Sequence, residues 1–163
     1  MNNSIHNIAF GGGCHWCTEA VFSALTGVEL VKQGYVASTS PNESYSEAVV
    51  VHFNAELIPL KVLIEIHLHT HNSQTNHSMR DKYRSAIYCS KDSQHIESMV
   101  ILERLQEQFD ANIITQVLPF VNFKPARESI QEYYLKHPEA PFCKRYISPK
   151  IKYLEAKYAK HLS

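Results

Sequence analysis

A chain of 163 residues with 44% hydrophobic and 20% charged residues has the composition of an ordinary soluble globular protein. This length suits one domain, which we expect to span residues 1–163 with a C-terminal tail from about residue 137. Sixteen basic and sixteen acidic side chains leave no net charge, so the composition does not indicate a nucleic-acid or membrane partner. No apolar run approaches the ~20 residues of a spanning helix, and residues 1–6 lack secretory-signal features. We therefore expect a cytoplasmic protein, and we expect a monomer.

The hydrophobic periodicity predicts alternating strands and helices along the chain. Strands are predicted at residues 4–10, 28–36, 47–53, 83–89 and 113–121, and helices at residues 14–25, 60–69, 92–109 and 126–135, followed by a basic C-terminal helix. The first six elements run β-α-β-β-α-β, which is the order of the split β-α-β motif. The predicted fold class is α+β, a two-layer ferredoxin-like sandwich with a C-terminal extension.

The most informative stretch is the run Gly11-Gly12-Gly13-Cys14-His15-Trp16-Cys17 near the N-terminus. A strand leads into three glycines, and a cysteine then opens a segment with helical spacing. The free N–H groups and the helix dipole at such a position stabilise a thiolate. Cys14 is therefore predicted to be a reactive thiol, and Cys17 lies on the same helix face within one turn of it.

Two further interpretations follow from the cysteines and histidines alone. The Cys14-x-x-Cys17 spacing could serve a general thiol–disulfide oxidoreductase. Alternatively, His67, His69, His71 and His77 could join Cys14 or Cys17 in binding zinc or copper, since alternating imidazoles share one side of an extended chain and His67 and His71 share a helix face.

Several blocks in a fixed order resemble the A-type methionine sulfoxide reductases, the peptide-methionine (S)-S-oxide reductases. The stretch Gly13-Cys14-His15-Trp16-Cys17 resembles the G-C-F-W-G or G-C-F-W-C motif of this family. Further along, Gly34-Tyr35, Ser46-Glu47-Ala48-Val49, Lys82-Tyr83-Arg84-Ser85-Ala86-Ile87-Tyr88 and the tail from Tyr134 to Cys143 resemble the G-Y, A-E-V/A-V, Q-Y-R-S-A-I-Y and Y-L-x-K-N-P…Y-C blocks. The similarity covers residues 7 to about 145.

The resemblance implies a role for each residue that it matches. Cys14 matches the nucleophile that attacks the sulfoxide sulfur and becomes a sulfenic acid. Glu47 matches the acid that protonates the oxygen, a task for which burial is expected to raise the carboxyl pKa. Tyr35 and Tyr83 match phenols that hydrogen-bond the oxygen, and Trp16 matches the aromatic wall for the S-methyl group.

Recycling of the enzyme needs a second thiol that attacks the sulfenic acid. Cys143 is the family-aligned candidate, expected on a mobile, proline-flanked tail, whereas Cys17 is the local alternative. A relay from Cys14 through Cys17 to Cys143 is also open. The resemblance implies no bound cofactor and no metal, with thioredoxin or another dithiol as the external reductant.

The chain departs from the family pattern at two positions near the predicted substrate. His15 stands where the family has phenylalanine, and a protonated imidazole there could stabilise the Cys14 thiolate. The usual aspartate before the Q-Y-R-S block corresponds to Ser78, and its neighbour His77 could take over part of that role, or Asp81 could, although its offset differs. His15, His77 and Ser78 are therefore predicted to lie with Trp16 at the substrate site.

Overall fold

The computed structural model describes residues 5–13, 15–76, 79–80, 82–127, 136–137, 139–141 and 143–162, with only the backbone of residue 15. The elements within these residues are β1 (Ile5–Gly11), α1 (His15–Ser23), β2 (Val28–Ala37), β3 (Ser46–Asn54), α2 (Leu60–Thr70), β4 (Ala86–Cys89), α3 (Asp92–Leu105), η1 (Gln106–Gln108), β5 (Gln116–Pro119), β6 (Asn122–Pro125), η3 (Cys143–Ile147), α5 (Ser148–Lys157) and η4 (Ala159–His161).

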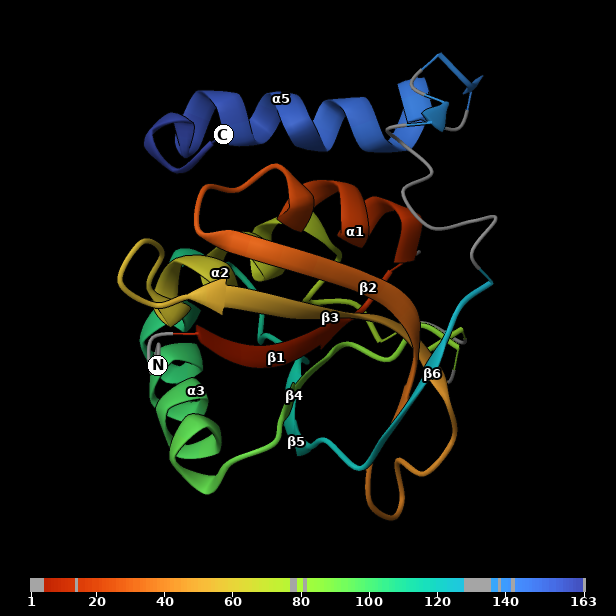
Figure 1. Cartoon of the computed structure of the whole chain (residues 1–163). Helices are drawn as coiled ribbons and strands as arrows, with labels where there is room; N and C mark the ends of the chain where they lie inside the picture. Colours follow the sequence, from red (N-terminus) through yellow and green to blue (C-terminus); the bar gives the residue numbers. More distant parts are fainter. Residues whose placement is uncertain are drawn as a thin grey trace.

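The strands described form one six-stranded sheet in the order β5-β4-β1-β3-β2-β6 (Figure 1). The pairs β4-β1, β1-β3, β3-β2 and β2-β6 are antiparallel, whereas β4 and β5 run parallel. The α+β prediction is confirmed, and the sheet is mixed rather than purely antiparallel.

The prediction of a single strand at residues 113–121 is wrong. Its apolar run divides into β5, which pairs with β4 at one edge, and the approach to β6, which pairs with β2 at the other. Between them, Phe120 N–H donates to Cys89 C=O and Val121 N–H donates to Ala37 C=O. The segment therefore crosses one face of the sheet, which a local periodicity cannot reveal.

Two other boundaries differ from the prediction. The fourth strand begins at Ala86 rather than at Tyr83, because Lys82 and Tyr83 both donate backbone N–H groups to Met79 C=O in a turn. The long third helix ends at Leu105 and continues as the short turn η1. Most of the helix predicted at residues 126–135 lies outside the described residues.

The core lies between the sheet and its helices. Along β1, Ile8 and Phe10 join the main core with side chains from α1, α2, α3 and α5, while Ala9 faces the opposite side of the sheet. That opposite face is covered by Leu118, Phe120 and Phe123. The rings of Phe10 and Phe22 stack with centroids 4.7 Å apart, which fixes α1 on β1 close to the glycine stretch.

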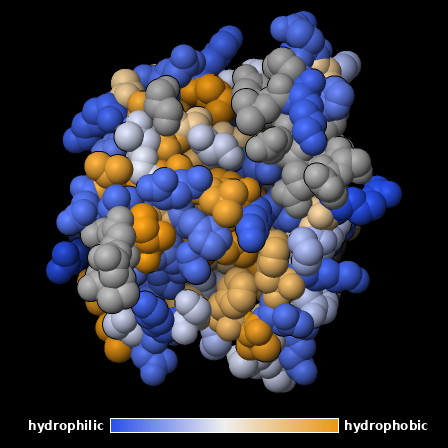
Figure 2. Space-filling view, in the orientation of Figure 1, coloured by the Kyte–Doolittle hydropathy of each residue, from blue (hydrophilic) through white to orange (hydrophobic). Residues whose placement is uncertain are grey.

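The C-terminal helix α5 runs alongside α1 on the outside of the molecule (Figure 1). Figure 2 shows that apolar residues on the face in view form several groups separated by polar ones. No helix in the described part of the chain is long and apolar enough to cross a bilayer.

Candidate active site

The glycine stretch connects β1 to α1 where three backbones meet. A Cβ atom added to Gly11 would lie 2.8 Å from Arg84 O and 3.0 Å from Glu47 O, and Gly12 has a φ of +147°. Glycine is needed at both positions because a side chain would collide at the first and strain the backbone at the second. The predicted strand, turn and helix around Cys14 are confirmed, but Cys14 itself lies outside the described residues.

Two side chains from elsewhere in the chain hold the glycine loop. The Arg80 guanidinium donates from Nη1 to Gly12 O (2.7 Å) and to Tyr83 O (2.9 Å). The His71 ring lies against Gly12, so close that a Cβ there would be 2.4 Å from His71 Cδ2. The loop before Cys14 is therefore fixed to the segment that carries Tyr83.

The imidazoles of His67 and His71 stack with centroids 4.1 Å apart. His67 Nε2 hydrogen-bonds Gly11 O at 2.7 Å, and His71 bonds His67 O through Nδ1 and Ser85 Oγ through Nε2. Burial lowers the pKa of His67 far below its usual value and that of His71 to about 4, so both rings are neutral at pH 7. They act as structural hydrogen-bonding groups behind the loop.

The metal-binding interpretation finds no support in the part of the chain that the structure describes. His69 Nε2 hydrogen-bonds Gln108 Oε1 at 2.7 Å, and its ring stacks on Phe109. It shares none of these partners with His67 or His71. No group of three His, Cys, Asp or Glu side chains is arranged for a metal ion among the described residues. His77 lies outside them.

Tyr35 and Glu47 face each other across neighbouring strands. They are directly opposite in the antiparallel register of β2 and β3, so their side chains leave the same face of the sheet. Glu47 is buried and Tyr35 is half-buried. Glu47 N–H donates to Lys82 C=O at 2.9 Å, which brings the third predicted segment to the same place.

The turn before β4 carries Tyr83 to this pair. Ser46 Oγ donates to Lys82 C=O (2.9 Å) and accepts from Arg84 N–H (2.7 Å), so one hydroxyl on β3 holds both sides of Tyr83. Lys82 Nζ lies 3.8 Å from Glu47 Oε2 and 5.1 Å from the centroid of the Tyr83 ring. The structure therefore groups Tyr35, Glu47, Tyr83 and, in addition, Lys82.

Sequence reasoning did not single out Lys82 as a site residue. The only signal was its position in the block Lys82-Tyr83-Arg84-Ser85, where the family motif has glutamine. Replacement of glutamine by lysine adds a positive charge next to a predicted site residue, and this change of charge is the signal that could have indicated Lys82.

Trp16, Cys17 and Cys143 lie together where η3 packs against α1. Cys17 and Cys143 are buried in one apolar cluster with Ala20 and Ile147, and Trp16 packs against it. Cys143 does not extend from the surface, because η3 places its side chain under α1 with no exposed area. Burial raises the pKa of the Cys143 thiol.

Other predicted substrate residues fall outside the described atoms. Ser78 and His77 are not described, and neither is the side chain of His15.

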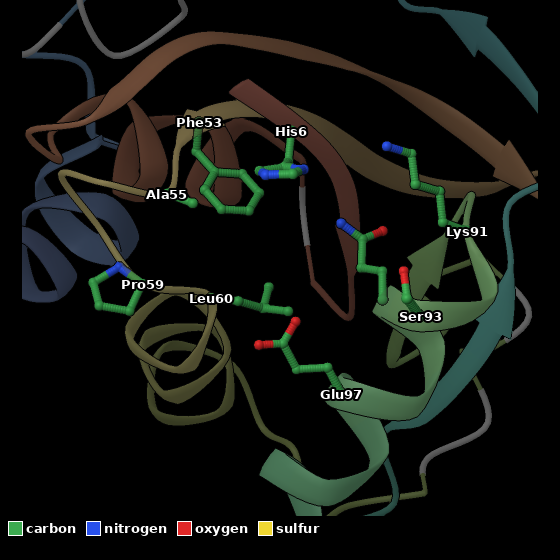
Figure 3. A pocket seen from close by; sticks show the side chains of 9 residues that line it. His6, Phe53, Ala55, Pro59, Leu60, Lys91, Ser93 and Glu97 are labelled. Atoms are coloured by element: carbon green, nitrogen blue, oxygen red, sulfur yellow. The ribbon is translucent and has the colours of Figure 1, made fainter. Parts of the chain in front are cut away.

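A separate cavity of about 310 Å³ opens at the far end of β1 (Figure 3). It is lined by His6, Phe53, Leu60, Lys91 and Glu97, among others, and by none of the predicted site residues. His6 and Gly11 are five residues apart on one strand, which corresponds to about 17 Å. We therefore separate this cavity from the candidate active site.

Comparison with known proteins points to one family. The family model of peptide methionine sulfoxide reductase matches residues 6–162. A "Peptide methionine sulfoxide reductase MsrA" from Pasteurella multocida is 37% identical over 91% of this chain and 92% of its own length. The crystal structure of Mxr1 from Saccharomyces cerevisiae in reduced form covers 86% of this chain and 90% of its own, with a TM-score of 0.72 and 25% identity.

A further structure shows Mxr1 from Saccharomyces cerevisiae in complex with Trx2. It covers 80% of this chain and 85% of its own, with a TM-score of 0.61 and 24% identity, and it adds support for the fold. The match of the family model over nearly the whole chain decides the assignment. The chain belongs to the peptide methionine sulfoxide reductase family, whose enzymes reduce methionine sulfoxide.

Proposed function

We propose that this enzyme reduces the S-epimer of methionine sulfoxide, free or within proteins, with Cys14 as the nucleophile. The observation that carries the proposal is the grouping of Tyr35, Glu47 and Tyr83 beside the glycine loop that leads to Cys14. A Cβ atom on Gly11 would lie 3.0 Å from Glu47 O, and Arg80 bonds both Gly12 O and Tyr83 O. A sulfoxide oxygen near this group would find an acid and two phenols.

The proposed reaction consumes one thiolate, one sulfoxide and one proton, and it forms one sulfenic acid and one methionine. The Cys14 thiolate attacks the sulfoxide sulfur, the sulfur–oxygen bond of the substrate breaks, and the oxygen ends on Cys14 as a sulfenic acid. The substrate sulfur gains two electrons and the cysteine sulfur loses two. Glu47 acts as the acid that gives the oxygen its proton, and the phenols of Tyr35 and Tyr83 stabilise the charge that develops there.

The remaining predicted residues would bind the substrate. Trp16 would receive the S-methyl group, and His15, His77 and Ser78 would border the same space. A half-buried indole on α1, packed against the Cys17 and Cys143 cluster, supports this assignment for Trp16.

The test is incubation of the reduced protein with each resolved epimer of methionine sulfoxide and a thiol reductant. We expect methionine to form from the S-epimer and not from the R-epimer. The control is the protein with its thiols alkylated beforehand, which should form none. Absence of turnover with the S-epimer would overturn the proposal.

We propose that thioredoxin recycles the enzyme in the cytoplasm, after a second thiol has converted the sulfenic acid into a disulfide. Cys17 and Cys143 share one buried cluster against α1, which supports an internal thiol. The structure of Mxr1 in complex with Trx2 supports thioredoxin as the reductant. Burial raises the pKa of the Cys143 thiol, which slows its attack as a thiolate while it stays in this cluster.

Replacement of each candidate thiol by serine should identify the resolving cysteine. We expect Cys143→Ser to form one equivalent of methionine and then stop when thioredoxin is the reductant, because the sulfenic acid is left without its partner. Cys17→Ser is measured in parallel, and a stop after one equivalent in both variants indicates the relay. Continued cycling of Cys143→Ser would reject Cys143 as the resolving thiol.

We also propose a finer description of the fold. Strands β1 to β4 with α1 and α2 would form a ferredoxin-like unit, to which β5, β6 and the C-terminal helix are added within one domain. The order β4-β1-β3-β2, with every neighbouring pair antiparallel, supports it.

A further inference from the structure

Lys82 is a cation at the edge of the candidate active site. Its ammonium lies 3.8 Å from Glu47 Oε2 and 5.1 Å from the Tyr83 ring centroid, while 57% of its side chain is exposed and Glu47 is almost fully enclosed. The side chain thus reaches inward from the rim toward the buried acid. The neighbouring phenol of Tyr83 is the main reason that the pKa of Lys82 is raised.

The position of Lys82 is fixed by its backbone. Its carbonyl accepts hydrogen bonds from Glu47 N–H and from Ser46 Oγ, both at 2.9 Å, and its own N–H donates to Met79 O at 3.1 Å. Two of these bonds hold the base of the side chain against the first two residues of β3, and the third ties it to Met79. From this fixed backbone the ammonium reaches both Glu47 Oε2 and the Tyr83 ring.

We propose that Lys82 is a further catalytic residue of this enzyme, whose ammonium donates a hydrogen bond to the sulfoxide oxygen while Glu47 protonates that oxygen. This rests on the proposed function, since it places the oxygen between Glu47 and Tyr83. Lys82 keeps its proton throughout, so the balance of the reaction is unchanged. Its contribution is positive charge beside an oxygen that becomes more negative as the thiolate attacks.

A lysine can supply this stabilisation better than the glutamine found in the family motif. An ammonium offers three donors and a full charge, whereas an amide offers two donors and only a dipole. Removal of one buried oxyanion donor costs an enzyme about 10²–10³ in rate. Solvent screens an ammonium as exposed as Lys82, so we expect an effect of about 10-fold.

The experiment compares Lys82→Met with the parent protein in single-turnover formation of methionine. Two substrates are used: free methionine S-sulfoxide, and its N-acetyl amide, which carries no carboxylate. We expect both substrates to lose about 10-fold in the maximal rate with little change in the concentration for half-saturation. Lys61→Met, an exposed lysine on α2, is the matched control and should behave as the parent.

A second measurement separates a chemical role from a structural one. In Lys82→Ala, added methylamine should restore part of the lost rate, because an exposed position lets a small ammonium ion enter; methanol should restore none.

An unchanged rate in Lys82→Met would overturn the proposal. The proposal would also be overturned if only the concentration for half-saturation by the free amino acid rose. That result would assign Lys82 to binding the substrate carboxylate. Either result leaves the S-epimer reaction itself intact, whereas failure of the parent protein to reduce that epimer contradicts the proposed function.

Discussion

Cys14→Ser is expected to lower methionine formation from the S-epimer by at least about 10³-fold, because a serine hydroxyl is a far weaker nucleophile than a thiolate at neutral pH. The change replaces one sulfur atom by oxygen at the residue before α1 in the sequence and should leave the fold intact. Methionine released in a single turnover is the measurement, since it does not depend on recycling. Circular dichroism and thermal unfolding of the variant check that its structure is kept.

Cys89→Ala is the matched control for this prediction. Cys89 is buried in β4, its Sγ lies 3.6 Å from Ser98 Oγ, and burial raises its pKa, so it is an inert structural thiol. This variant should keep its single-turnover rate even if its thermal stability falls. Retention of activity in Cys14→Ser, or equal losses in the two variants, would remove Cys14 from the role of nucleophile.

Much of the fold could be predicted because local patterns determine it. The alternation of Ile8 and Phe10 against Ala9 marks β1, and the continuous apolar run from Ala48 to Val51 marks the central strand β3. Failures occurred where pairing over long distances decides the outcome. The run 113–121 carries one apolar pattern, and only pairing at opposite sheet edges divides it into β5 and the approach to β6.

The site illustrates the same limit. The glycine stretch and Cys17 are close in sequence, so a reactive thiol was a local inference. Tyr35 and Glu47 alone read as ordinary strand residues, and only the β2–β3 register makes them neighbours. Lys82 was missed because its position depends on Ser46, thirty-six residues away, and on the turn that removes Tyr83 from the strand.

Glu47→Gln is expected to lower the single-turnover rate by about 10²–10⁴, the range that a positioned general acid contributes. Glutamine has nearly the same shape and can still donate a hydrogen bond to the oxygen, but it cannot transfer a proton. Binding should therefore change little, and the loss should lie in the maximal rate rather than in half-saturation. Glu29→Gln, an exposed carboxyl on the same sheet in β2, is the control and should keep the parent rate.

The double variant Glu47→Gln with Lys82→Met tests whether the two groups act on one oxygen. Residues that contact each other and serve the same transition state are not additive, so the combined loss should be smaller than the product of the two single losses. Independent sites would give the full product. A loss of less than about 10-fold in Glu47→Gln would show that the proton has another source than a general acid at this position. Loss of that remaining rate in the double variant would assign the proton to the ammonium of Lys82, which lies 3.8 Å from Glu47 Oε2.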